Sequence, residues 1–187
     1  MADAAGETAL YAVVDDRSVL DGLSGGHDRA LWLFLNKPDL FRKAEEARYT
    51  DERRRSKSWD GFLVEAGREL RNDPASLDAF KAAVGRHFFS DNVHVDIFTR
   101  RRTTFDGDDS DLIQITVYRE GGPKDFLDFE QGQLVRRPRR PVFEAALTYE
   151  PATGVVEVVA SARESREDIV RIMARDLLGI DFEAHRL

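Results

Sequence analysis

The sequence contains no cysteine and no long apolar run. The lack of cysteine excludes disulfide bonds, cysteine nucleophiles, thiolate zinc sites and cysteine-ligated iron–sulfur clusters, and it fits a reducing compartment. The longest apolar stretch, Leu31–Leu35, is far shorter than the roughly 20 residues that a membrane span needs. At the N-terminus no basic segment precedes an apolar run, so no secretory signal is expected. These observations predict a cytoplasmic protein without membrane association.

An excess of positive charge is also missing, because the formal net charge of the 187 residues is -7. This value argues against a general nucleic-acid or anionic-membrane binder. The hydrophobic fraction of 42% and the aromatic fraction of 10% are typical of a globular protein rather than a disordered one. Arginine outnumbers lysine by 23 to 5, which indicates a GC-rich bacterial genome.

The common catalytic and cofactor motifs are largely absent as well. No S-x-x-K motif occurs, and the one match to G-x-S-x-G, at Gly22–Gly26, lies in a segment with the composition of a turn. A P-loop, a G-x-G-x-x-G motif and an HExxH motif are also missing, which removes frequent signatures of nucleotide and zinc sites. The absences favour a non-catalytic role, and no cofactor is predicted.

The order of the expected elements predicts one α+β domain over residues 1–187. No internal repeat, low-complexity segment or long linker divides the chain. The chain is helix-rich over 1–90 and strand-rich over 91–161, and it ends in an amphipathic helix over 164–179. Such segregation of helices and strands is typical of the α+β class. We therefore expect an antiparallel sheet of four to five strands, packed on one face by N-terminal helices and the C-terminal helix.

Proline and capping residues divide the expected helices. Pro38 lacks a backbone N–H, so it ends the helix before it and can open the next one. Asp73 followed by Pro74 is a typical N-cap and first helical position. Ser165 and Gly179 are the expected caps of the last helix. The first of these helices is expected to start near His27 or Asp28, the helix opened by Pro38 to end near Arg54, and the helix opened by Pro74 to end near Phe88. Earlier in the chain, Thr8–Val14 is a β-prone segment.

Alternating apolar and polar residues predict two β-hairpins after residue 92. The first joins the runs at 93–98 and 113–118, and the second joins Val142–Tyr149 to Val155–Ala160. Phe126–Glu130 is a candidate for a further strand between the two pairs. Trp59–Val64 fits no single element.

The first hairpin has one polar face, which is the main candidate for a binding site. An antiparallel sheet can leave one face in water, so a solvated face is one interpretation. The other is a ligand or partner platform, which aromatic residues among the polar groups favour. The predicted binding residues are His94, Asp96, Phe98, Arg100, Arg102, Gln114, Thr116 and Tyr118.

His94 and Asp96 also suit a metal site. Residues i and i+2 of one strand share a face at about 7 Å between Cα atoms. A divalent metal could take both side chains, with His87 as a third ligand. No recognised metal-binding motif accompanies them, so the main expectation is that no metal is bound.

Three other features have simple interpretations. Asp106–Asp111 resembles a calcium loop, but position twelve, which is Glu in an EF-hand, is Val117 here, so a hairpin turn is favoured. Glu144 and Glu157, expected on paired strands, are either a carboxylate pair or part of a solvent-facing side. Three arginine clusters would form an anion site only if they converged in space. The clusters are at 53–55, at 100–102 and at 136, 137, 139 and 140.

The leading functional hypothesis is a non-catalytic binding or protein-interaction module. It is expected to bind a protein partner or to self-associate, and nucleic acid is not expected. The alternative is a metal-dependent hydrolase or nuclease that uses His94, Asp96 and His87. A small-molecule sensor would need a concave pocket, which the sequence does not predict.

Overall fold

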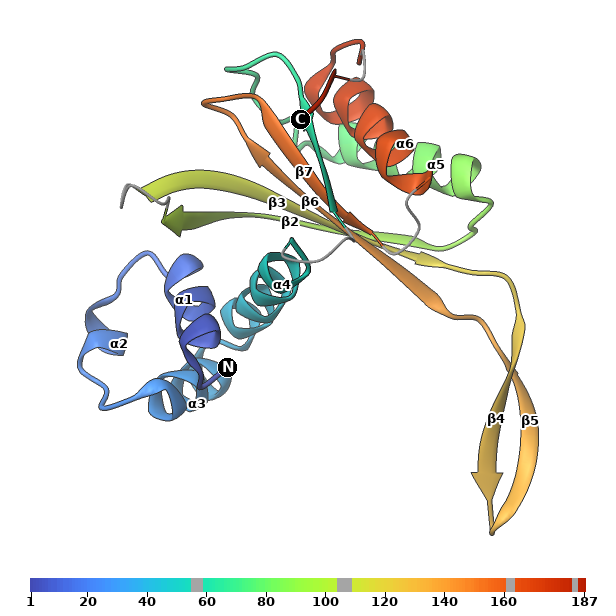
Figure 1. Ribbon diagram of the computed structural model, residues 1–187, viewed down its shortest axis with the longest axis horizontal. Coiled ribbons are helices and arrows are strands. Elements are labelled where there is room, and N and C mark those ends of the chain that lie inside the picture. The colour runs from blue at the N-terminus through green and yellow to red at the C-terminus, as the bar shows by residue number, and fades with distance from the viewer. Residues whose placement is uncertain (55–58, 104–108, 161–163, 183–184) are drawn as a thin grey trace.

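A twisted antiparallel sheet lies at the centre of the computed structural model (Figure 1), which describes residues 1–54, 59–103, 109–160, 164–182 and 185–187. The sheet has the strand order β2-β3-β6-β7-β1-β8, and a separate two-stranded sheet pairs β4 with β5. The strands are β1 (Trp59–Leu63), β2 (Val93–Thr103), β3 (Asp109–Glu120), β4 (Lys124–Glu130), β5 (Gln133–Arg139), β6 (Val142–Glu150), β7 (Val155–Ala160) and β8 (His185–Arg186).

The helices lie on both faces of this sheet, and the predicted α+β class is confirmed. The four strands β2, β3, β6 and β7 pair in chain order, as the two predicted hairpins require. The helices are α1 (Ala4–Ala12), α2 (Ser18–Asp21), α3 (Gly26–Asn36), α4 (Pro38–Arg54), α5 (Pro74–Phe88) and α6 (Glu164–Met173), which continues into the π-helical turn η1 (Ala174–Leu178).

The apolar face of the sheet packs against α5 and α6. Alternate residues of the strands, such as Ile115 and Leu147, share a buried cluster with Phe80 of α5 and Met173 of α6. This alternation is the period-two pattern of a sheet with one buried face. For these two helices, the expected packing on the apolar face is found.

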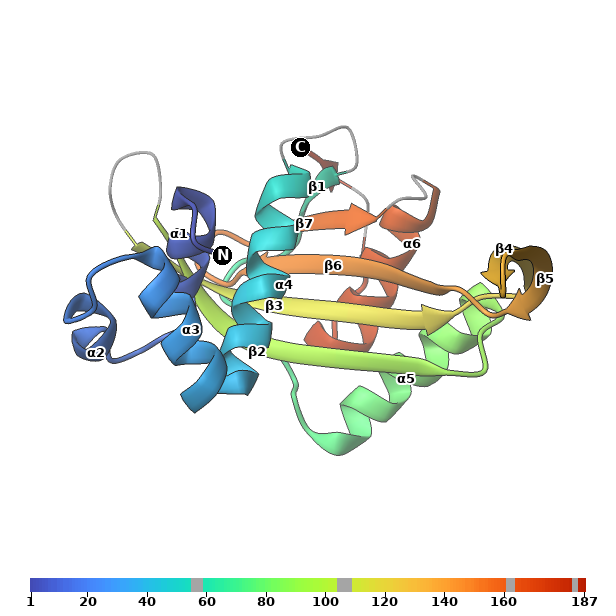
Figure 2. The ribbon, with the colours of Figure 1, turned by 90° about the horizontal axis from the view of Figure 1, so that it is seen from below.

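The other face of the sheet is crossed by α4, as the view from below shows (Figure 2). The sequence predicts that the N-terminal helices share one face with the C-terminal helix, and α4 departs from that arrangement. Glu46 and Thr50 of α4 are buried here and form hydrogen bonds with Thr116 and Gln114 of β3. The polar face of the sheet is therefore covered by the chain itself.

A second, smaller core joins α1, α2 and α3 to α4. It contains Leu10, Leu20 and Leu33, all fully buried. The prediction of a strand at Thr8–Val14 is wrong, because α1 occupies most of that segment. The carboxylate of Asp3 accepts a hydrogen bond from the backbone N–H of Gly6 and so caps α1.

The capping signals of the later helices are largely confirmed. The Asp73 carboxylate accepts a hydrogen bond from the Ser76 N–H at the start of α5. Gly179 ends the last helix in the left-handed region with φ 67, a conformation that glycine adopts without steric cost. Ser165 is not the expected N-cap, since α6 begins at Glu164.

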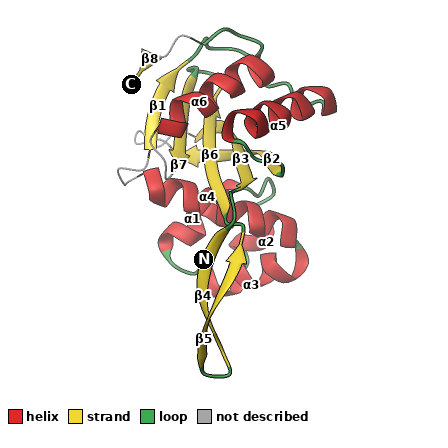
Figure 3. Cartoon of the chain, turned by 90° about the vertical axis from the view of Figure 1, so that its right-hand side faces the viewer, coloured by secondary structure: helices red, strands yellow, loops and turns green. Residues whose placement is uncertain are grey.

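The strands β4 and β5 form a hairpin that projects from the sheet (Figure 3), and we call it the arm. Its turn contains Gln131 and Gly132, both with positive φ, as expected for a type I′ hairpin turn. Phe126–Glu130 is therefore a strand, but it lies outside the main sheet, where β3 pairs directly with β6. Among the described helices, none has the length and apolar character needed to cross a membrane.

Candidate functional site

The predicted polar binding face is largely buried beneath α4. Gln114 and Thr116 have no exposed surface, and Arg100 and Phe98 are 1% and 6% exposed. The interpretation of this face as solvated or open is wrong for these residues, because the inward side of α4 is itself polar and pairs with them. At the far end of the face, His94 remains exposed.

A hydrogen-bond network joins α4 to the centre of the sheet. The Thr116 hydroxyl donates to Glu46 Oε2 at 2.8 Å, and the Gln114 amide donates to the Thr50 hydroxyl at 3.2 Å. Burial raises the pKa of Glu46, an effect that the hydrogen bond from Thr116 opposes and the charge of Asp96 reinforces. The network positions α4 over the sheet, since a buried polar group without a partner is costly.

Arg54 of the first arginine cluster and Arg100 and Arg102 of the second converge on this face, where carboxylates pair with them, whereas Arg55 lies outside the described residues. Arg100 donates two hydrogen bonds to Asp51, at 2.8 and 2.9 Å, and Arg102 donates a third at 3.1 Å. Arg102 also donates to Glu157 at 2.8 Å, and Arg54 pairs with Glu157 at 2.6 Å. Because each of these arginines faces a carboxylate, the convergence stabilises the packing of α4 rather than forming an open anion site.

The residues of the metal hypothesis are split between the two faces. His94 Nε2 lies 3.3 Å from Asp96 Oδ1, and Arg42 of α4 lies 3.5 Å from Asp96 Oδ2. His87 belongs to α5 on the opposite face, where its Nε2 lies 3.1 Å from Asp168 of α6. Within the described ranges, no group of three histidine or acidic residues is placed to hold a metal ion. The geometry gives the metal-dependent hydrolase hypothesis no support.

The calcium-like segment and the carboxylate pair can also be placed. Residues 104–108 of the segment lie outside the described residues, and Asp109–Asp111 form the start of β3. Glu157 pairs in register with Thr148 rather than with Glu144. Glu144 and Glu157 are thus separate groups, each close to different arginines.

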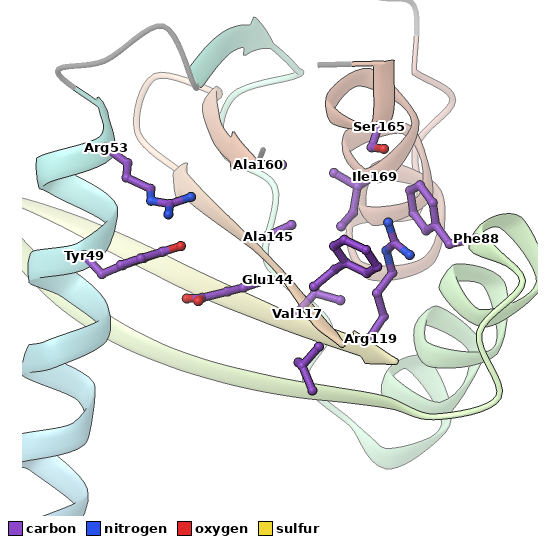
Figure 4. Close-up of a pocket in the computed structure, with 12 residues that line it drawn as sticks. Tyr49, Arg53, Phe88, Val117, Arg119, Glu144, Ala145, Ala160, Ser165 and Ile169 are labelled. Atoms are coloured by element: carbon purple, nitrogen blue, oxygen red, sulfur yellow. The ribbon is translucent and has the colours of Figure 1, made fainter. Parts of the chain in front are cut away.

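The cavity that we consider the best candidate site opens beside β6, between α4 and α6 (Figure 4). It has a volume of about 260 Å³. Strand β6 pairs with β7 only from Ala145 onward, so Val142–Glu144 leave one strand edge unpaired by β7. The lining residues are Tyr49, Arg53, Phe88, Val117, Arg119, Val142, Phe143, Glu144, Ala145, Ala160, Ser165 and Ile169.

The two sides of this cavity differ in their electrostatics. On the α4 side, the Arg53 guanidinium stacks on the Tyr49 ring at 4.3 Å. Burial raises the pKa of Glu144, while the charge of Arg53 and a hydrogen bond from Tyr49 oppose that rise. On the α6 side, Arg119 lies between two aromatic rings, and burial lowers its pKa. The sequence singles out Glu144 and, within the first arginine cluster, Arg53, but it does not indicate Tyr49 or Arg119, because the lining residues come from separate elements that only the fold brings together.

The arm carries an apolar surface that we call the arm face. The register of the hairpin pairs Phe129 with Leu134 and Leu127 with Arg136, so the three apolar side chains share one side. Leu127, Phe129 and Leu134 are 61%, 74% and 57% exposed. A two-stranded hairpin is only marginally stable in water by itself, and exposed apolar patches are a common feature of interaction surfaces.

A second apolar surface, the α3 stripe, lies on the N-terminal helices. It consists of Leu31, Phe34 and Leu35, which are 58%, 54% and 67% exposed. Their spacing of i, i+3 and i+4 places them on one side of α3. The α3 stripe and the arm face lie at opposite ends of the molecule (Figures 1 and 2).

Comparison with known protein families and with curated protein sequences finds no match.

Proposed function

We propose that this protein is a non-catalytic protein-interaction module that associates with a second copy of itself through the arm. The observation that carries the proposal is the arm face, an exposed apolar surface on a projecting hairpin. Apolar contact supplies the main favourable free energy of protein association. A projecting hairpin with such a surface is well placed to pack against another molecule.

The second copy is favoured as the partner because the chain offers a complementary surface. The arm segment 124–140 carries five Lys and Arg against three Asp and Glu, whereas residues 1–36 carry six Asp and Glu against two Arg. The arm is thus net positive, and the segment that contains the α3 stripe is net negative. Complementary charge around two apolar surfaces favours their association and its correct orientation.

The geometry requires this contact to form between two molecules. The arm face and the α3 stripe lie at opposite ends of one chain, so the arm does not reach its own α3 (Figures 1 and 2). In a two-fold dimer, each arm would pack against the α3 stripe of the other copy. Such an interface is self-complementary, as two-fold symmetry demands.

Sedimentation velocity of the purified chain from about 1 to 100 µM tests this proposal, since that range brackets micromolar affinity. The native protein is expected to dimerise, and the double variant Phe129→Ser/Leu134→Ser is expected to remain monomeric. The control Phe126→Ser changes the opposite side of the arm, where Phe126 is 40% exposed, and should still dimerise. A strictly monomeric native protein would contradict the proposal.

A mixing experiment identifies the surface that receives the arm. The variant Leu31→Ser/Leu35→Ser removes exposed side chains of the α3 stripe and should also be monomeric. Mixed with the arm variant Phe129→Ser/Leu134→Ser, it should form a heterodimer, because one intact arm then meets one intact α3 stripe. Dimerisation of the α3 variant by itself would show that the arm binds a different surface.

Further features support a protein partner in a reducing compartment. Arg54, Arg100 and Arg102 face carboxylates within the chain, and the net charge is -7, so a protein is favoured over a nucleic acid as the partner. The lack of cysteine fits the cytoplasm. The high ratio of arginine to lysine supports a bacterial origin.

A further inference from the structure

The cavity beside β6 contains a guanidinium group whose surroundings are unusual for a structural arginine. Arg119 follows Val117 on the apolar side of β3, and its Cζ lies 4.6 Å from the ring centroid of Phe88 and 4.6 Å from that of Phe143. Within the described part of the chain, no carboxylate or carbonyl oxygen accepts a hydrogen bond from it. The two rings hold the planar group, while its N–H donors, which lie in the plane, face no acceptor there.

The other charged groups of the cavity have neighbours of their own. Glu144 interacts with Arg53 and Tyr49 on the α4 side. In the close-up, Glu144 points toward Tyr49 and Arg53 of α4, whereas Arg119 lies on the α6 side near Phe88 (Figure 4). The arrangement therefore has a positive group at one end, where an incoming anion would find donors.

The chemistry of Arg119 defines the kind of ligand. A guanidinium presents a planar fork of donors that matches the two oxygens of a carboxylate or a phosphate. The nearby walls are apolar, with Val117 and Ile169, and Ser165 adds a hydroxyl group. The volume of about 260 Å³ is slightly below the roughly 300–1,000 Å³ of drug-sized ligand sites, so the ligand is small.

We propose that this cavity binds a small organic acid, with Arg119 gripping its carboxylate or phosphate and the apolar walls holding its body. This site is separate from the arm face and does not depend on self-association. Phe88 and Phe143 are positioning residues, because their rings fix the orientation of the guanidinium.

Isothermal titration of the purified full chain with benzoate and with phenyl phosphate tests the proposal, and benzyl alcohol is the uncharged probe. At least one acid is expected to bind, and the stronger one distinguishes a carboxylate site from a phosphate site. The variant Arg119→Gln should weaken this binding about tenfold or more, and Arg119→Lys should fall between, because lysine keeps the charge without the planar fork. Arg140→Gln is the matched control, since Arg140 is outside the cavity and its side chain is 49% exposed.

Two results would overturn the proposal. One is that neither acid binds the native protein at concentrations up to about 10 mM, a limit that corresponds to very weak affinity. The other is that Arg119→Gln binds as tightly as the native chain. If that variant does not fold, as judged by circular dichroism, amide chemical shifts of the native protein decide: acid-induced shifts must centre on Phe143, Ser165 and Ile169, and shifts confined elsewhere would refute the site.

Discussion

Replacement of Asp51 is expected to destabilise the protein strongly, because this carboxylate neutralises a buried arginine. The Arg100 side chain is 1% exposed and donates two of its hydrogen bonds to Asp51, at 2.8 and 2.9 Å. Arg102 donates a third hydrogen bond to the same carboxylate at 3.1 Å. Asp51→Asn keeps the shape of the side chain but removes the charge that compensates Arg100.

The magnitude follows from the solvent exposure of the two partners. Loss of one partner of a buried ion pair typically costs about 3–5 kcal/mol, because the other charge remains buried. The Asp51 side chain is 36% exposed, so water can solvate part of this site and reduce the cost. We therefore expect Asp51→Asn to lower the free energy of unfolding by about 2–4 kcal/mol, or the midpoint temperature by roughly 5–15 °C for a chain of this size.

The reverse change, Arg100→Met, is expected to cost less. It removes the buried charge itself, and Asp51 retains the hydrogen bond from Arg102 together with its contact with water. Methionine can fill much of the space of the arginine stem, so the expected loss is about 1 kcal/mol. The asymmetry between the two variants is the signature of a buried arginine with a partly solvated partner.

Urea unfolding monitored by circular dichroism measures both variants. Glu52→Gln is the control, because Glu52 is the next residue of α4, is exposed, and pairs with Arg48 at i,i+4; its loss should cost about 0.3–0.5 kcal/mol. A loss of less than about 1 kcal/mol for Asp51→Asn would refute the argument that Arg100 depends on this carboxylate for compensation.

The pH dependence gives an independent check. Burial alone would raise the pKa of Asp51, but the hydrogen bonds and charges of Arg100 and Arg102 outweigh it, and the pKa is lowered. A carboxyl group with a lowered folded-state pKa contributes stability above its unfolded pKa of about 3.9, and this stability is lost as the pH falls through the folded value. The stability difference between the native protein and Asp51→Asn should therefore be constant from about pH 5 to 8 and shrink below about pH 4.

Two other changes should alter stability in opposite directions. Glu46→Gln should increase the free energy of unfolding at pH 7 by about 1 kcal/mol, because burial raises the pKa of Glu46 and the amide oxygen can still accept from Thr116. Because the pKa of Glu46 is higher in the folded state, its ionisation destabilises the native protein progressively as the pH rises above the unfolded-state pKa of about 4.3. The stability gain of Glu46→Gln should therefore vanish below about pH 4 in urea titrations, and a gain that persists there would contradict the explanation. Gly154→Ala should destabilise by about 2–4 kcal/mol in thermal melts, because φ is +74 and an added Cβ would lie 2.3 Å from the carbonyl oxygen of Val64. Gly67→Ala, with φ +75 and no atom within 4 Å of the added Cβ, isolates the backbone strain and should cost only about 1–2 kcal/mol; equal losses would show that the contact with Val64 is unimportant.

Local patterns in the sequence were sufficient to predict most of the sheet. The strands around 93–98, 113–118, Val142–Tyr149 and Val155–Ala160 alternate clearly, and the register of the folded hairpins follows that alternation. Such a pattern depends only on which side of a strand faces an apolar core. The strand prediction at Thr8–Val14 failed because the capping of the helix by Asp3 outweighed β-propensity.

The covering of the polar face could not be predicted in this way. The inward side of α4 contains Glu46, Thr50 and Asp51, and it looks like a solvent-facing side when read alone. The facing strand residues, such as Thr116 and Arg100, look the same. Two polar patterns that complement each other are indistinguishable in sequence from two solvated patterns, because the difference lies in their long-range hydrogen bonds.

The contrast between polar groups that have partners within the chain and groups that do not explains why the candidate sites lie away from the predicted polar face. On that face, Arg100 and Arg102 donate to carboxylates of the same chain, so those arginines have little capacity left for an external ligand. At the arm face, by contrast, Phe129 is 74% exposed, and in the cavity Arg119 is held by two rings with no acceptor among the described residues. Groups whose favourable interactions are incomplete within the chain gain most from binding, since association then removes apolar surface from water or supplies the missing acceptor. The arm face and Arg119 are therefore better candidates for binding than the buried polar face, although the predicted histidine, aspartate and arginine residues lie on that face.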